Sequence, residues 1–159
     1  MNARLRRRLG AAAPENADAA LAAYLGHPGR RPPLAALYGH RQVMNRHRHL
    51  VDGPACLAVL TEDAITLSHP KTGAFLIECP LGDLDGYLID AQGRFVLHFD
   101  PGAGHSHVGS FRPVVGPTAT LSARQASTLF VQQATATWQA RTGRTFTNNW
   151  LMPDAAGSS

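Results

Sequence analysis

The chain has few of the residues that mark disulfide-rich, membrane-spanning or acyl-transferring proteins. It holds only two cysteines, Cys56 and Cys79, which are too few for a disulfide framework and are expected as small buried strand residues. No apolar run approaches the ~20 residues that a membrane-spanning helix needs. The sequence has no Gly-x-Ser-x-Gly motif, and neither cysteine has neighbours that would activate its thiol. What remains is a chain of 159 residues, with room for one domain of ordinary size.

Positive charge is concentrated in the first third of the chain. Residues 1–50 contain nine arginines and two acidic residues, whereas residues 51–159 contain six basic and nine acidic residues. This asymmetry predicts a basic helical arm over 1–50, able to contact a polyanion or a partner protein, in front of a small β-rich domain. The candidate binding residues are the arginines of that arm, namely Arg4, Arg6, Arg7, Arg8, Arg30, Arg31, Arg41, Arg46 and Arg48.

Two helices are expected within the basic arm. Apolar residues recur at helical spacing over 16–25, and a second helix is predicted over 33–50. Leu34, Leu37 and Met44 fall near one face of that second helix. Such a face could pack on another copy of the chain, so a structural subunit of a homo-oligomer or larger assembly is one alternative function.

A basic cluster closes the second predicted helix. Arg46, His47, Arg48 and His49 would lie in its last turn, where positive charge suits the negative end of the helix dipole. The cluster is expected either as a basic contact surface or as a solvated face of the helix.

The pattern changes period after residue 53. Short segments with alternating apolar residues recur about every ten residues, with no helix between them, which favours an antiparallel meander curled into a barrel or sandwich. The expected strands are 55–61, 64–68, 74–79, 84–90, 94–100 and 105–112.

One long helix is expected after the strands. Ser122 and Gln125 have the spacing of a capping box, and an apolar stripe that includes Phe130 and Trp138 follows. The helix should end at Gly143 and cover the open end of the curled sheet. Residues 143–159 are expected to form a flexible tail.

Three local patterns resemble strands of the bacterial pleckstrin-homology-like (PH-like) and GRAM-like families. They are the hairpin Leu60-Thr61-Glu62-Asp63-Ala64-Ile65-Thr66-Leu67, the strand entry Pro80-Leu81-Gly82-Asp83-Leu84-Asp85-Gly86, and the strand Phe95-Val96-Leu97-His98-Phe99 before a glycine-rich loop. The resemblance covers about residues 55–142 and implies an α+β, mainly β, fold. That fold is a curled antiparallel sheet or barrel of six or seven strands with a C-terminal helix. A seventh strand would lie at 114–115 or before Ala55.

The same resemblance also indicates which class of partner the chain could bind. Phospholipid-binding members of these families carry a basic loop between their first strands, and many other members bind protein segments or form scaffolds. The corresponding loop of this chain is predicted to hold Glu62 and Asp63. The resemblance therefore favours a protein partner, with anionic lipid or another polyanion as the alternative.

A small metal-dependent enzyme is a further alternative. His105 and His107 alternate on one predicted strand, so both imidazoles could reach one ion, and His98 on the preceding strand could supply a third ligand. No carboxylate or cysteine is paired with them in the sequence, so neither metal nor cofactor is expected. Sequence-specific nucleic-acid binding is not expected either, because no recognition helix or aromatic stacking pattern accompanies the basic arm.

Together these patterns predict a non-enzymatic binding or scaffold module. The first residues are charged like a secretion signal, but residues 14–18 interrupt the apolar run that such a signal requires. We therefore expect a cytoplasmic protein, with a peripheral place at the membrane as the alternative.

Overall fold

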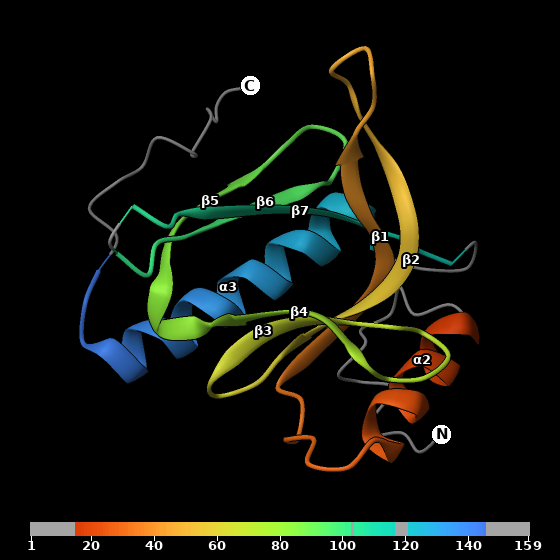
Figure 1. Ribbon diagram of the computed structural model, residues 1–159, viewed down its shortest axis with the longest axis horizontal. Helices are drawn as coiled ribbons and strands as arrows, with labels where there is room; N and C mark the ends of the chain where they lie inside the picture. Colours follow the sequence, from red (N-terminus) through yellow and green to blue (C-terminus); the bar gives the residue numbers. More distant parts are fainter. Residues whose placement is uncertain (1–14, 103, 117–120, 146–159) are drawn as a thin grey trace.

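The protein is described here by a computed structural model that covers residues 15–102, 104–116 and 121–145 (Figure 1). Seven antiparallel strands form one sheet in the order β4-β3-β2-β1-β7-β6-β5. The strands are β1 (Ala35–Met44), β2 (Leu50–Leu60), β3 (Ala64–Ser68), β4 (Phe75–Pro80), β5 (Leu84–Ile89), β6 (Phe95–Phe99) and β7 (His107–Pro113). The helices are α2 (Glu15–Gly26), the short 3-10 turn η1 (Leu81–Asp83) and α3 (Ala123–Thr142).

The sheet is a meander folded back on itself. Each strand pairs with its neighbour in sequence except β4 and β5, and the pairing of β1 with β7 joins the two halves. The sheet does not close, because β4 and β5 stay at its two ends. The expected fold class is thereby confirmed: a mainly β protein whose curled antiparallel sheet is followed by a C-terminal helix.

Helix α3 begins and ends where its capping residues predict. The Ser122 hydroxyl accepts a hydrogen bond from the Gln125 amide at 3.1 Å, and the Ser122 amide donates to Gln125 Oε1 at 2.8 Å. Gly143 ends the helix with a φ of 68°, a left-handed conformation that glycine adopts without strain. No helix among the described residues is both long and apolar enough to cross a bilayer.

The main hydrophobic core lies between α3 and the curled sheet (Figure 1). Phe130 and Trp138, the two large residues of the predicted stripe, are each only 3% exposed. The Phe130 ring stacks on the Phe95 ring of β6 with centroids 5.3 Å apart, and Phe95 also contacts Phe111 of β7. The expectation that α3 packs its apolar stripe on the sheet is therefore confirmed.

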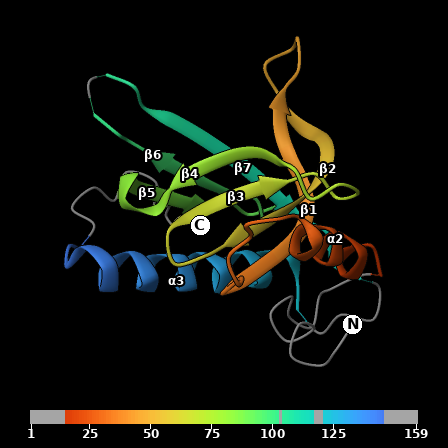
Figure 2. The ribbon, with the colours of Figure 1, turned by 60° about the horizontal axis from the view of Figure 1, so that its bottom comes forward.

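A second, smaller core holds α2 against the outer face of β1 and β2 (Figure 2). Leu21 and Tyr24 of α2 are buried there against Leu57 and Val59 of β2. Burial raises the pKa of the Tyr24 phenol, which keeps its proton and donates a 2.9 Å hydrogen bond to the Arg31 carbonyl. The helix predicted over 16–25 is thus present, one residue longer at each end.

The helix predicted over 33–50 is wrong, because these residues form β1 and the start of β2. Gly39 gives one reason: a Cβ there would overlap the Arg112 carbonyl and lie 2.8 Å from the Phe111 ring, so the glycine allows β1 to approach β7 closely. The sheet consequently begins at Ala35. The missing seventh strand is the one expected before Ala55, and residues 114–115 form no strand.

Candidate interaction surface on the β1–β2 hairpin

The hairpin of β1 and β2 projects beyond the rest of the molecule (Figures 1 and 2). Strand β7 pairs with β1 only over Gly39–Arg41, and β3 pairs with β2 only over Leu57–Leu60. Beyond those points no third strand in the described part of the chain supports the hairpin. Because a two-stranded hairpin is only marginally stable by itself in water, this projecting part needs support at its base or a partner along its length.

Asn45 shapes the turn at the end of the hairpin. Its side-chain Oδ1 accepts hydrogen bonds from the backbone amides of His47, at 2.8 Å, and His49, at 3.0 Å. Arg48 adopts a φ of 62°, in the left-handed region. We call residues 45–49 the hairpin tip. The tip carries two arginines and two histidines, and all four side chains are exposed: Arg46, His47, Arg48 and His49.

Apolar side chains cover the hairpin just below its tip. Val43, Met44, Leu50 and Val51 are between 38% and 61% exposed, and we call them the shank. Val43 pairs with Val51 and Met44 with Leu50 across the two strands, so the two pairs lie on opposite faces. The shank is therefore apolar on both faces, and grouped apolar side chains in water mark a contact surface.

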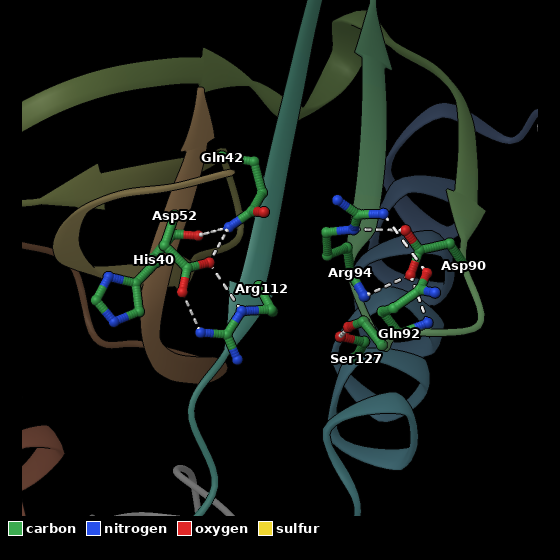
Figure 3. A network of polar contacts seen from close by, with 9 residues as sticks. His40, Gln42, Asp52, Asp90, Gln92, Arg94, Arg112 and Ser127 are labelled. Carbon is green, nitrogen blue, oxygen red and sulfur yellow. Dashed lines mark hydrogen bonds and ion pairs between the residues drawn. The ribbon is translucent and has the colours of Figure 1, made fainter. Parts of the chain in front are cut away.

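A polar network fixes the base of the hairpin to β7 (Figure 3). Asp52 Oδ1 accepts hydrogen bonds from Arg112 Nε and Gln42 Nε2, each at 2.8 Å, and Asp52 Oδ2 ion-pairs with Arg112 Nη2. A 2.9 Å hydrogen bond also links His40 Nδ1 to the Gly53 carbonyl. Arg112 and, to a lesser extent, Gln42 hold the pKa of the Asp52 carboxyl well below its usual range. Side-chain contacts thus tie the base to the sheet, whereas in the described part of the chain no other strand pairs with the tip or the shank.

Acid is expected to weaken this base. A carboxyl whose folded-state pKa is depressed stabilises the fold above its unfolded pKa of ~3.9 and loses that contribution as the pH falls further. Both partners are about one-third exposed, so the pair should contribute only ~0.2–1 kcal/mol. Asp52→Asn should therefore lower stability slightly at pH 7 and reduce the stability lost between about pH 4 and pH 2. Urea titrations across this range measure both effects, and an unchanged acid dependence in Asp52→Asn would contradict the assignment.

The nine predicted binding arginines do not form one patch. Arg46 and Arg48 lie at the hairpin tip, and Arg41 lies lower on β1. Arg30 instead donates a 2.8 Å hydrogen bond to the Gly73 carbonyl and stacks 3.6 Å above the Phe75 ring, and Arg31 ion-pairs with Asp63 at 2.6 Å. These two hold the chain between α2 and β1 against the sheet. The remaining four, Arg4, Arg6, Arg7 and Arg8, lie outside the described residues, as do residues 146–159 of the predicted flexible tail.

The basic cluster of residues 46–49 is therefore not the end of a helix. It lies in the loop between the first two strands, which the sequence analysis expected to be acidic. The loop between the first two strands holds Arg46, His47, Arg48 and His49, whereas Glu62 and Asp63 lie between β2 and β3. The prediction that the first loop is acidic is wrong, because residues 35–44 form a strand and residues 45–49 are therefore the first loop between strands. An isolated glycine inside the supposed helix, Gly39, was the sequence signal that could have exposed the error.

The three histidines of the proposed metal site do not converge. His107 pairs with Phe99 across the strands, while His98 pairs with Val108, so His98 and His107 face opposite sides of the sheet. His98 contacts Asp85 Oδ2 at 3.0 Å, and His105 lies before β7 begins. Among the described residues, no three His, Cys, Asp or Glu side chains gather as a metal site would require. The interpretation of His98, His105 and His107 as one site is therefore wrong.

The helical face proposed for self-association does not exist either. Leu37 belongs to the main core, Leu34 packs partly against it, and only Met44 is exposed, at 61%. The two cysteines agree with their expected role: both are buried and free, and burial raises the pKa of Cys56 to about 11.

Comparison with known proteins gives likenesses of fold only. No protein-family model matches the chain, and no curated protein matches it. One similar solved structure is the complex of the PDZ-RhoGEF DH/PH domains with GTP-γ-S-activated RhoA, at a TM-score of 0.48 and 10% identity over 69% of this chain and 30% of the other. Another is the hSac2 domain of the human phosphoinositide phosphatase Sac2, at a TM-score of 0.43 and 14% identity over 67% of this chain and 69% of the other. The likeness to these two structures does not bear on a bacterial origin, which stays a prediction.

Proposed function

We propose that the chain is a non-enzymatic binding module that docks the tip and shank of its β1–β2 hairpin into a groove of a partner protein. The carrying observation is that the hairpin, which projects from the molecule in Figure 2, combines a basic tip with a shank that is apolar on both faces. A matching groove would have apolar walls and carboxylates at its closed end. A protein partner is also expected from the sequence, but the proposal depends on the hairpin alone, because the acidic loop that favoured a protein lies between β2 and β3.

The order of residues along the hairpin favours a protein over a bilayer. Insertion tip first would place Arg46 and Arg48 deepest, and an arginine at the centre of a bilayer costs about 2.5–3.5 kcal/mol on insertion scales. Lying flat on the membrane would cover only one face of the shank and leave the other in water. A groove can cover both faces and still supply acidic partners for the tip.

Charge reversal at the tip should weaken this contact strongly. Arg46→Glu/Arg48→Glu changes two exposed side chains of the turn, so the fold should persist while attraction to an acidic groove becomes repulsion. We expect affinity to fall on the order of tenfold or more, which corresponds to ~1.4 kcal/mol, and the remaining binding to depend less on salt. Lys71→Glu/Arg124→Glu, which makes the same charge change at exposed positions off the hairpin, is the matched control and should bind normally.

The measurement has two arms. A photo-crosslinking residue in place of Met44 captures the native partner, which is then purified and titrated against the wild type and both double variants by calorimetry. Vesicles with and without phosphatidylserine form the second arm. Selective loss of partner affinity in the tip variant supports the proposal. Equal affinity in the two double variants, or binding to phosphatidylserine vesicles with no protein crosslink, contradicts it.

The proposal assigns no catalysis, metal or cofactor to the chain. It places the protein in the cytoplasm, with the membrane periphery as the alternative that the vesicle arm tests. Elemental analysis of protein purified without a histidine tag is a further check, and a stoichiometric transition metal would contradict the proposal.

A further inference from the structure

Arg48 is the one residue other than glycine that adopts a left-handed backbone conformation in the described part of the chain. Its φ is 62°, within the region that glycine enters without strain. The other described residues with a positive φ are all glycines: Gly29, Gly73, Gly93, Gly102, Gly104 and Gly143. In this conformation a Cβ crowds the following carbonyl oxygen, so the backbone at Arg48 carries a strain that the glycines avoid.

The turn itself does not depend on the Arg48 side chain. The Arg48 amide donates a 3.0 Å hydrogen bond to the Asn45 carbonyl, and the Asn45 amide donates a 2.9 Å hydrogen bond to the His49 carbonyl. Both bonds use only the backbone, so glycine at position 48 could form the same turn. The Arg48 side chain is exposed, and among the described residues it makes no ion pair or side-chain hydrogen bond. Strain that gives the fold nothing in return indicates a role for the side chain outside the fold.

From this strain we infer that Arg48 is the anchor residue of the hairpin tip, whose guanidinium donates two parallel hydrogen bonds to one carboxylate of the partner protein. The inference rests on the proposed function and goes further, because it assigns the specific contact to one of the two tip arginines. Arginine suits this contact, since its planar guanidinium presents paired N–H groups in a fixed geometry that lysine lacks. Arg46 then acts through its charge, which attracts an acidic groove without fixing the orientation of the partner.

Replacing Arg48 by glycine should make the free hairpin more stable. Arg48→Gly removes the strain, and we expect the Asn45 amide to exchange with deuterium on the order of fivefold more slowly, because its bond to His49 closes the turn. Arg46→Gly is the matched control, because Arg46 lies in the same turn and has no positive φ. Glycine there adds flexibility without relieving strain, so the same amide should exchange faster. Amide exchange followed by NMR on the full chain, without any partner, measures both effects.

Binding is then measured with the protein captured through the crosslinking residue at Met44, titrated by calorimetry against unmodified full-length variants. Arg48→Lys keeps the positive charge but loses the paired donors, so affinity should fall on the order of tenfold. Arg46→Lys makes the same change at the other arginine and should bind within about twofold of the wild type. Arg48→Gly should combine a more stable hairpin with a loss of at least about tenfold in affinity, a combination that a purely structural role cannot produce.

Two results would overturn this inference and leave the proposed function in place. Equal losses in Arg48→Lys and Arg46→Lys, with binding still abolished in Arg46→Glu/Arg48→Glu, would mean that the tip acts by charge alone. Unchanged or faster exchange of the Asn45 amide in Arg48→Gly would show that the left-handed conformation carries no strain. If the wild-type chain captures no protein, the proposed function and this inference are both contradicted.

Discussion

Phe130→Ala is expected to lower the free energy of unfolding by about 3–5 kcal/mol, a large part of the stability of a domain this size. The Phe130 side chain is 3% exposed, stacks on Phe95 and lies in the centre of the α3 stripe. Its removal leaves a cavity in addition to the lost apolar burial, because α3 and the curled sheet can close only partly around the gap. Urea unfolding followed by circular dichroism measures the change.

The adjacent residue provides a matched control for this prediction. Leu129 lies on the same helix but is 54% exposed, so Leu129→Ala should change stability by no more than about 0.5 kcal/mol. Similar losses for the two variants would show that α3 does not bury its Phe130 face in solution, and the sheet would then lack the helix that covers it.

Tyr24→Ala is the second variant with a large expected effect. Tyr24 is 1% exposed, packs in the core between α2 and the outer face of the sheet, and donates its hydroxyl to the Arg31 carbonyl. Truncation should cost about 3–5 kcal/mol and detach α2, with faster amide exchange from Glu15 to Gly26 as its local signature. Tyr24→Phe should lose only about 0.5–1.5 kcal/mol, the usual net contribution of one hydrogen bond.

The control for Tyr24 is again its neighbour. Leu25 is 39% exposed, so Leu25→Ala should leave both the global stability and the exchange of α2 nearly unchanged. If Tyr24→Ala matched Leu25→Ala in both measurements, α2 would not be docked on β1 and β2 in solution, and the small core would not contribute to the fold.

Local chemistry made much of the fold predictable. The capping box of Ser122 and Gln125 and the left-handed Gly143 fix both ends of α3, and these signals depend only on nearby residues. Strand β3, Ala64–Ser68, was likewise predictable because a tight turn precedes it and its apolar pattern is short and clear.

Strand β1 was not predictable, because its first half is buried on both faces. Leu37 packs in the main core, while Ala36 and Tyr38 contribute to the small core under α2. Burial on two faces removes the alternation of apolar and polar residues by which a strand is recognised. The apolar residues that remain happen to fall at helical spacing, so the segment resembled a helix until its partners were known.

The candidate site was predictable only in part for the same reason. Arg46 and Arg48 were identified by charge alone, which needs no structure. The shank could not be identified, since Val43 and Val51 become one exposed pair only through the β1–β2 register.

The central claim is that the β1–β2 hairpin is the contact surface of the protein, and amide NMR with the captured partner tests it most directly. In the free protein, cross-strand contacts between Val43 and Val51 and between Met44 and Leu50 should be observed. On addition of the partner, the largest chemical-shift changes should lie between residues 43 and 51, and they should vanish in Arg46→Glu/Arg48→Glu. Shift changes centred on the β4 or β5 edge, with the hairpin unaffected, would contradict the account.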